Sequence, residues 1–230
     1  MKELLTDSQK FYYSDLLLIT VSLYCAYFIY QNTDKEKEFH YLYLYPLSSF
    51  FNSVFNYYIL YFSTISKSND LEFYLVLSNL LFSIIEFYIL SFFLQHFTKN
   101  IILKKLILLL QIIYIINIFF LNLTLSHEII VQISYILNSI YITAIGILCL
   151  IGMFKFYQDE NLIKLKIFWI LSGVFIYFIG TIPIFLFSKL IFHDNYYISE
   201  EKVYSINYIA YIILFSSLSI STKCNTITNQ

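Results

Sequence analysis

Apolar residues run along this chain in seven long blocks separated by short polar breaks. A helix needs about 20 mostly apolar residues to cross a bilayer, and the blocks are of this order or longer. We therefore expect an all-α integral membrane bundle of seven transmembrane helices in a single domain. The blocks cover residues 14–31, 39–63, 71–97, 101–123, 129–157, 163–192 and 203–221.

The blocks are rich in β-branched and aromatic residues, which would favour strands in water. In lipid, the backbone polar groups of an uninterrupted run of this length are satisfied only within a helix. A membrane strand would instead show about 10 residues that alternate between polar and apolar, and no block has that pattern. The breaks are short, so we expect sequential helices to be antiparallel neighbours. They lie at 34–38, 66–70, 98–100, 126–128, 158–161 and 193–202.

The composition also indicates a membrane protein. Hydrophobic residues make up 59% of the chain and charged residues 13%, and the mean hydropathy is +0.71. Soluble domains carry about 25% charged residues, so the excess apolar surface requires the lipid bilayer as its solvent. Outside the short breaks there is no basic patch, and we expect no nucleic acid partner.

Lysine placement predicts the orientation of the bundle. The chain has no arginine, and its lysines divide nine to five between the two ends of a seven-span bundle. The side with more lysines is expected to be cytoplasmic, which places the C-terminus in the cytoplasm and the N-terminus outside the plasma (inner) membrane. The first ten residues have mixed charge and no cleavage site follows, so the first block is expected to be a retained span. The nine lysines are Lys35, Lys37, Lys99, Lys104, Lys105, Lys155, Lys164, Lys166 and Lys223.

Glu86 is the one acid at the centre of a block. A charge at the bilayer centre costs about 2.5–3.5 kcal/mol on insertion scales, so Glu86 should face the bundle interior, be protonated, or both. Asn79 and Ser83 share its helix face by their i, i+4, i+7 spacing. The sequence therefore predicts a ligand or proton site, and the alternative is an interhelical hydrogen bond that only fixes packing, worth about 0.6 kcal/mol. The candidate residues are Glu86, Asn79, Ser83, Asn117, Asn138, Asn207 and Tyr211.

Other chemistry finds no support in the residues. There is no GxSxG motif or paired-aspartate motif inside a block, so no catalytic residue is predicted. The four histidines lie near block ends, and the cysteines show no CxxC or Cys/His spacing, so no metal site and no disulfide framework are expected. The last block has no lysine for a Schiff base, and we expect no cofactor. The histidines are His40, His96, His127 and His193, and the cysteines are Cys25, Cys149 and Cys224.

The sixth block contains residues that affect helix packing. Gly173 and Gly180 are seven apart and share a face, which favours close approach of another helix. Pro183 permits a kink. The bland interpretation, tight static packing with a local kink, competes with that of a helix that moves during signalling or transport.

Two long stretches carry a family resemblance. The segment KIFWILSGVFIYFIGTIPIFL (166–186), followed by INYIAYIILF (206–215), resembles the end of small seven-helix membrane proteins of Bacteroidetes-type bacteria. The second and third blocks, with YPLSSFFNSVFNYYI and SNLLFSIIEFYILSFFL, extend the resemblance to nearly the whole chain. Its most specific part is the FWI…SG…IYF…G core at 168–180. The resemblance implies a seven-helix fold and partnership with two-component sensor proteins, and it implies no catalytic or binding residue.

These observations favour a receptor-like sensory or accessory membrane protein without enzymatic activity. Its polar interior around Glu86 would bind a small ligand or respond to protonation, and a membrane or cytoplasmic signalling partner would receive the signal. The alternative is a small proton-coupled transporter that uses Glu86. A lipid-modifying enzyme is the least favoured, because the chain lacks Ser/His/Asp and His clusters.

Overall fold

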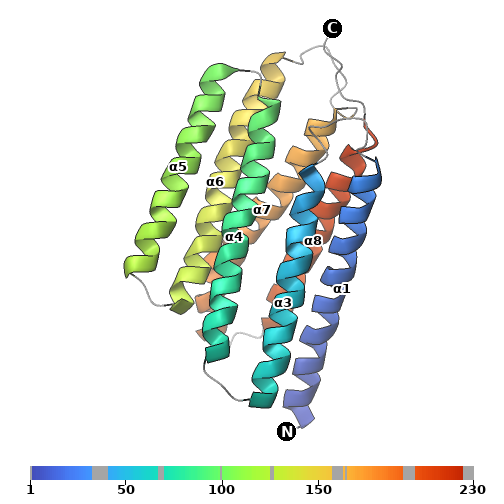
Figure 1. Ribbon diagram of the computed structural model, residues 1–230, viewed down its shortest axis with the longest axis vertical. Helices are drawn as coiled ribbons and strands as arrows, with labels where there is room; N and C mark the ends of the chain where they lie inside the picture. The colour runs from blue at the N-terminus through green and yellow to red at the C-terminus, as the bar shows by residue number, and fades with distance from the viewer. Residues whose placement is uncertain are drawn as a thin grey trace.

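The computed structural model describes residues 2–32, 41–66, 70–98, 100–124, 127–156, 163, 165–193 and 200–224. Within these ranges the chain forms seven α-helices and one short 3-10 helix, which confirms the all-α prediction (Figure 1). Most of the predicted polar breaks, including 34–38 and 158–161, lie outside the described residues. The elements are α1 (Lys2–Asn32), η1 (Tyr41–Tyr43), α3 (Leu44–Ser66), α4 (Asp70–Phe97), α5 (Ile101–Thr124), α6 (His127–Phe156), α7 (Lys166–His193) and α8 (Glu200–Ser221).

Four stretches of these helices are long and apolar enough to cross a membrane, so the chain is a multi-pass membrane protein. Two further apolar stretches, Leu16–Asn32 in α1 and Ile206–Ser221 in α8, are shorter. Helix α3 is rich in Tyr, Asn and Ser, which lower its hydropathy. A count of seven spans therefore stays a prediction. The four long spans are Val76–Phe97, Ile101–Leu121, Ile133–Lys155 and Lys166–Ile184.

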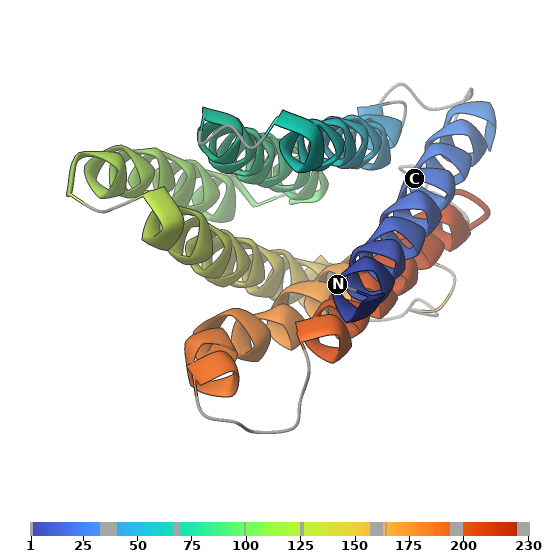
Figure 2. The ribbon, with the colours of Figure 1, turned by 90° about the horizontal axis from the view of Figure 1, so that it is seen from below.

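Six of the helices close into a ring. Helix α1 packs on α3, α3 on α4, α4 on α6, α6 on α7, α7 on α8, and α8 again on α1. Helix α5 lies outside this ring, mainly against α6, and Figure 2 shows it at the edge of the bundle. Each sequential pair of helices is in contact, as expected, but α4 packs far more extensively on α6 than on α5. The polar face of α4 is turned to the ring interior, which explains this choice.

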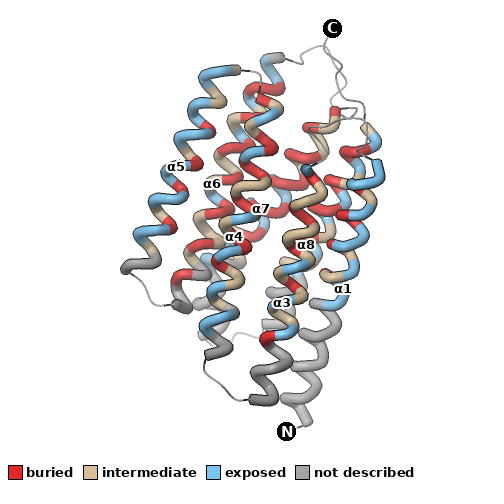
Figure 3. Tube along the Cα trace, in the orientation of Figure 1, coloured by how far each residue is buried: buried red, intermediate tan, exposed pale blue. Residues whose placement is uncertain are grey.

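The surface of the bundle is apolar. Buried residues lie on the inner faces of the helices, and exposed residues lie on the outer faces, most continuously along α5 (Figure 3). On that helix Ile102 is 69% exposed and Phe119 is 63% exposed. Such a continuous apolar surface is unfavourable in water, whereas it is favourable against the acyl chains of lipid. The start of α1 and the end of α8 lie at opposite ends of the bundle (Figure 1).

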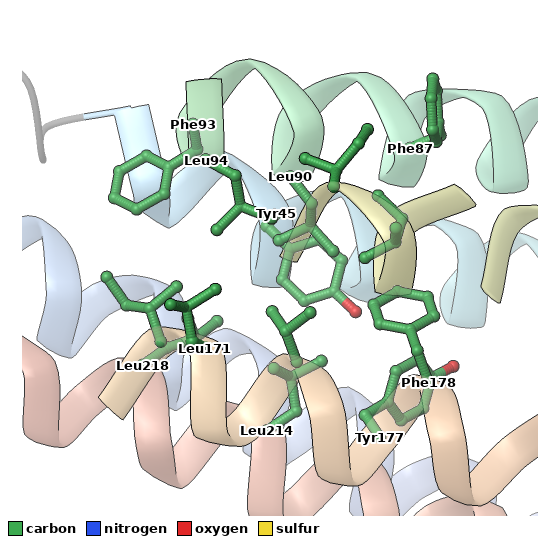
Figure 4. Packing of buried hydrophobic residues seen from close by; sticks show 14 of the residues in the cluster. Tyr45, Phe87, Leu90, Phe93, Leu94, Leu171, Tyr177, Phe178, Leu214 and Leu218 are labelled. Atoms are coloured by element: carbon green, nitrogen blue, oxygen red, sulfur yellow. The ribbon is translucent and has the colours of Figure 1, made fainter. Parts of the chain in front are cut away.

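Large side chains fill the interior of the ring. Tyr45 is completely buried and lies between leucines of α4 and side chains of α7 and α8 (Figure 4). Phe178 of α7 and Phe215 of α8 are 1% exposed. These side chains bring the inner faces of helices that are distant in sequence into one continuous core.

The two glycines of α7 have different surroundings. A Cβ atom added at Gly173 would lie 2.7 Å from Cβ of Ser217 on α8, so Gly173 permits the close approach of these two helices. Gly180 is exposed, and a Cβ atom there would meet nothing within 4 Å. The predicted close approach therefore holds at Gly173 and is wrong at Gly180. Pro183 lies inside α7 and is exposed.

This difference predicts the effect of an alanine at each glycine. We expect Gly173→Ala to lower the free energy of unfolding by about 1–3 kcal/mol, because the new methyl group overlaps a Cβ atom that cannot rotate away. Gly180→Ala, the matched control, should leave stability unchanged or raise it, since alanine favours helix. Thermal unfolding of the detergent-solubilised protein measures both. Ser217→Gly should rescue Gly173→Ala, and equal stability of the two alanine variants would contradict the close packing.

Candidate functional site

Glu86 lies in the interior of the ring and is 1% exposed. Its Oε1 accepts a hydrogen bond of 2.8 Å from the hydroxyl of Tyr45 on α3. Its Oε2 accepts a bond of 2.6 Å from the amide nitrogen of Asn138 on α6. The carboxyl group of α4 therefore connects two further helices, and each of its oxygens has a donor. No basic side chain among the described residues faces it.

Helices α7 and α8 bring aromatic side chains to the same place. The ring of Tyr45 lies edge-on to that of Phe215, with centroids 5.9 Å apart. Phe215 contacts Tyr211 on the same helix at 5.8 Å, and the ring of Tyr211 is 4.4 Å from that of Tyr177 on α7. Tyr177 and Tyr211 are both buried, at 3% and 6% exposed. Rigid aromatic rings of α7 and α8 thus pack beside Tyr45, which donates to Glu86.

Helix α1 reaches the edge of this group through Cys25. Its thiol donates to the carbonyl oxygen of Phe215 at 3.3 Å and lies 3.3 Å from the hydroxyl of Ser219. All six helices of the ring therefore meet here. We define the acid centre as Glu86 and four side chains around it, each from a different helix. Its members are Tyr45, Glu86, Asn138, Tyr177 and Tyr211.

The Glu86–Asn138 pair has more acceptors than donors. An ionised carboxylate accepts about four hydrogen bonds, and the described residues supply two to Glu86. The amide oxygen of Asn138 is buried and has no hydrogen-bond partner among the described residues. A buried acceptor without a donor costs about 1–3 kcal/mol. A proton on Glu86, or a small cation beside it, would satisfy these oxygens.

The other predicted residues of α4 contact different partners. Asn79 accepts from the amide of Asn56 at 2.9 Å and from the hydroxyl of Tyr135 at 3.4 Å. Ser83 lies 3.4 Å from the hydroxyl of Tyr114 on α5. These residues share the inner face of α4 with Glu86, as their spacing predicted, but they continue the polar row away from it.

The two remaining predicted residues lie in different places. Asn117 donates to the hydroxyl of Tyr141 at 2.7 Å, between α5 and α6 and outside the ring. Asn207 of α8 lies one turn from Tyr211, and its buried amide oxygen has no hydrogen-bond partner among the described residues. The structure therefore brings Glu86, Asn138 and Tyr211 together and separates Asn117 from them.

Sequence reasoning missed Tyr45 and Tyr177. The chain has 23 tyrosines, so a single tyrosine carries little information. A weak signal existed for Tyr45, which is a polar side chain at the start of a helix that enters the bundle.

The described residues contain no group of three or more His, Cys, Asp or Glu that could hold a metal ion.

No protein-family model matches this sequence, and comparisons with curated proteins and with solved structures give no significant match. The resemblance noted from the residues at 168–180 stays a prediction. Function must therefore be argued from the acid centre itself.

Proposed function

We propose that this chain is a receptor-like sensory or accessory protein of the plasma membrane, with seven transmembrane helices and no enzymatic activity. The observation that carries the proposal is the pair of hydrogen bonds that join Glu86 to Tyr45 and Asn138, inside a ring of six helices. A change at this one carboxyl group alters the contacts of α3, α4 and α6 together. Such a junction couples a local event to the arrangement of the bundle.

The species that Glu86 senses is a proton or a small cationic ligand. The surplus of acceptors around Glu86 and Asn138 supports this choice, because an anion would meet no donor there. The low dielectric of the interior makes the charge on Glu86 costly, so either binding event relieves a substantial penalty.

The signal leaves through the end of the bundle that carries the C-terminus. Helix α7 runs from Tyr177, in the acid centre, to Lys166 at that end. Trp169 lies one turn from Lys166 and donates from its indole nitrogen to the carbonyl oxygen of Ile163 at 2.9 Å. A shift of α7 would therefore reach a membrane or cytoplasmic partner docked near Lys104, Lys105 and Lys166. Lys164, also predicted to face the partner, lies outside the described residues.

A proton-coupled transporter is the second candidate. It is favoured by the polar row of Asn79, Ser83 and Glu86, which extends along the inner face of α4. Proton flux into liposomes distinguishes the two functions. A transporter would move protons together with a substrate and lose this flux in Glu86→Gln, whereas a sensor would show no flux.

The proposed orientation can be tested with the natural cysteines. Cys224 follows α8 and is partly exposed, whereas Cys25 and Cys149 are buried. We expect an impermeant maleimide to leave intact cells unlabelled and to label Cys224 after the membrane is opened. Cys224→Ser is the control and should abolish labelling. Labelling of Cys224 in intact cells would place the C-terminus outside.

The sensing role predicts a response at Trp169, the single tryptophan of the chain. We expect its emission to change as the pH is lowered, because protonation of Glu86 weakens its bond from Asn138 on α6, and α6 packs on α7. Glu86→Gln resembles the protonated acid, so its emission should match the low-pH form at every pH. Glu128→Gln, at the start of α6, is the control and should behave as the wild type. An identical pH response in wild type and Glu86→Gln would contradict the proposal.

A further inference from the structure

Lysines and acids divide unequally along the sequence. The breaks and block ends on the side of the C-terminus contain nine lysines and five acids, against five lysines and nine acids on the other side. The described lysines on the side of the C-terminus lie where α5 and α7 begin and where α6 and α8 end (Figure 1). They are Lys104, Lys105, Lys155, Lys166 and Lys223.

Three of these lysines lie around the outermost helix. Lys104 and Lys105 lie in the first turns of α5, and Lys155 lies in the last turn of α6. The two helices pack closely there, since a Cβ atom added at Gly152 would be 3.4 Å from a methyl group of Leu103. We name Lys104, Lys105 and Lys155 the lysine cluster.

The positive charge of the cluster is not neutralised within the described part of the chain, where none of the three ammonium groups forms an ion pair or a cation–π contact. The other two described lysines at this end, Lys166 and Lys223, differ because each has a partner. The ammonium group of Lys223 lies 5.2 Å above the ring centre of Phe28, and Lys166 is also engaged by a neighbour. Like charges held together without counter-charges attract an anionic group.

Exposed apolar side chains lie within one turn of the cluster. Ile101 and Ile102 are 70% and 69% exposed at the start of α5, and Ile151 and Phe154 are 54% and 52% exposed near the end of α6. A ligand that fits this surface has an anionic head at the membrane boundary and acyl chains beside it. A soluble anion would use the lysines alone and leave these side chains uncovered.

We propose that the lysine cluster binds the head group of an anionic phospholipid, whose acyl chains lie along the exposed faces of α5 and α6. Basic groups between helices at a membrane boundary hold phospholipid head groups in this way. The site is separate from the acid centre and does not depend on the proposed function, but it shares Lys104 and Lys105 with the surface proposed for a signalling partner. Lipid binding there would hold the start of α5, the outermost helix, in the membrane leaflet that is richest in anionic lipid.

The test uses the full chain in nanodiscs of phosphatidylcholine mixed with an equal amount of phosphatidylglycerol. Native mass spectrometry then counts the lipids that stay bound after release from the disc. Each lysine should contribute about fivefold in affinity, so Lys104→Gln/Lys105→Gln/Lys155→Gln should weaken retention of phosphatidylglycerol by on the order of 100-fold. Lys166→Gln/Lys223→Gln is the matched control, because it removes lysines from the same end of the bundle. This variant should retain phosphatidylglycerol.

Four outcomes decide the proposal. Selective retention by the wild type and the control, lost in the triple glutamine variant and restored by Lys104→Arg/Lys105→Arg/Lys155→Arg, supports it. Equal retention by the triple glutamine variant overturns it. Equal loss in the control overturns it too, because the charge of the whole end would then suffice. Displacement of phosphatidylglycerol by inorganic phosphate would show that the lysines bind a free anion, and would also overturn it. Circular dichroism verifies that each variant is folded.

Discussion

A carboxyl group in the middle of an apolar bundle must find hydrogen-bond donors on neighbouring helices, and this constraint shapes the interior of the protein. Glu86 meets it with the hydroxyl of Tyr45 and the amide of Asn138, from two different helices. Leaving either oxygen without a donor would cost about 1–3 kcal/mol. The positions of α3, α4 and α6 around this group are therefore linked, and the aromatic side chains of α7 and α8 complete the enclosure.

The two proposals assign separate tasks to the acid centre and the lysine cluster. The centre lies where all six ring helices meet, so an event there has access to the whole bundle. The cluster lies around α5, which the ring excludes and which presents most of its surface to lipid. One region is suited to change, and the other to anchoring. Helix α7 runs from the centre to the end that carries the lysines, and Trp169 lies near that end.

The sequence predicted the parts of this arrangement that depend on local pattern. Long apolar runs determine helices in lipid, and the spacing of Asn79, Ser83 and Glu86 correctly assigned them to one face. The sequence also indicates Asn138, because an acid at mid-membrane requires an amide or hydroxyl partner on another helix.

The order of helices around the ring was beyond the sequence. Nothing local distinguishes α5 from the others, and its exclusion follows from how well α4 and α6 pack against each other. Tyr45 was missed because tyrosines occur throughout the chain, and only the packing selects one of them. The close helix approach predicted at Gly180 is wrong for a similar reason. A shared helix face does not determine how far along that face a neighbouring helix stays in contact.

The most direct test of the central claim is a double-mutant cycle between Tyr45 and Glu86, read as the free energy of unfolding in detergent. If the carboxyl group couples α3 to α4, Tyr45→Phe should cost about 1–2 kcal/mol in the wild type and almost nothing in Glu86→Leu. Tyr24→Phe, at a position that is 66% exposed, should cost nothing in either background. Equal costs of Tyr45→Phe in both backgrounds would contradict the account, because the hydrogen bond would then link nothing.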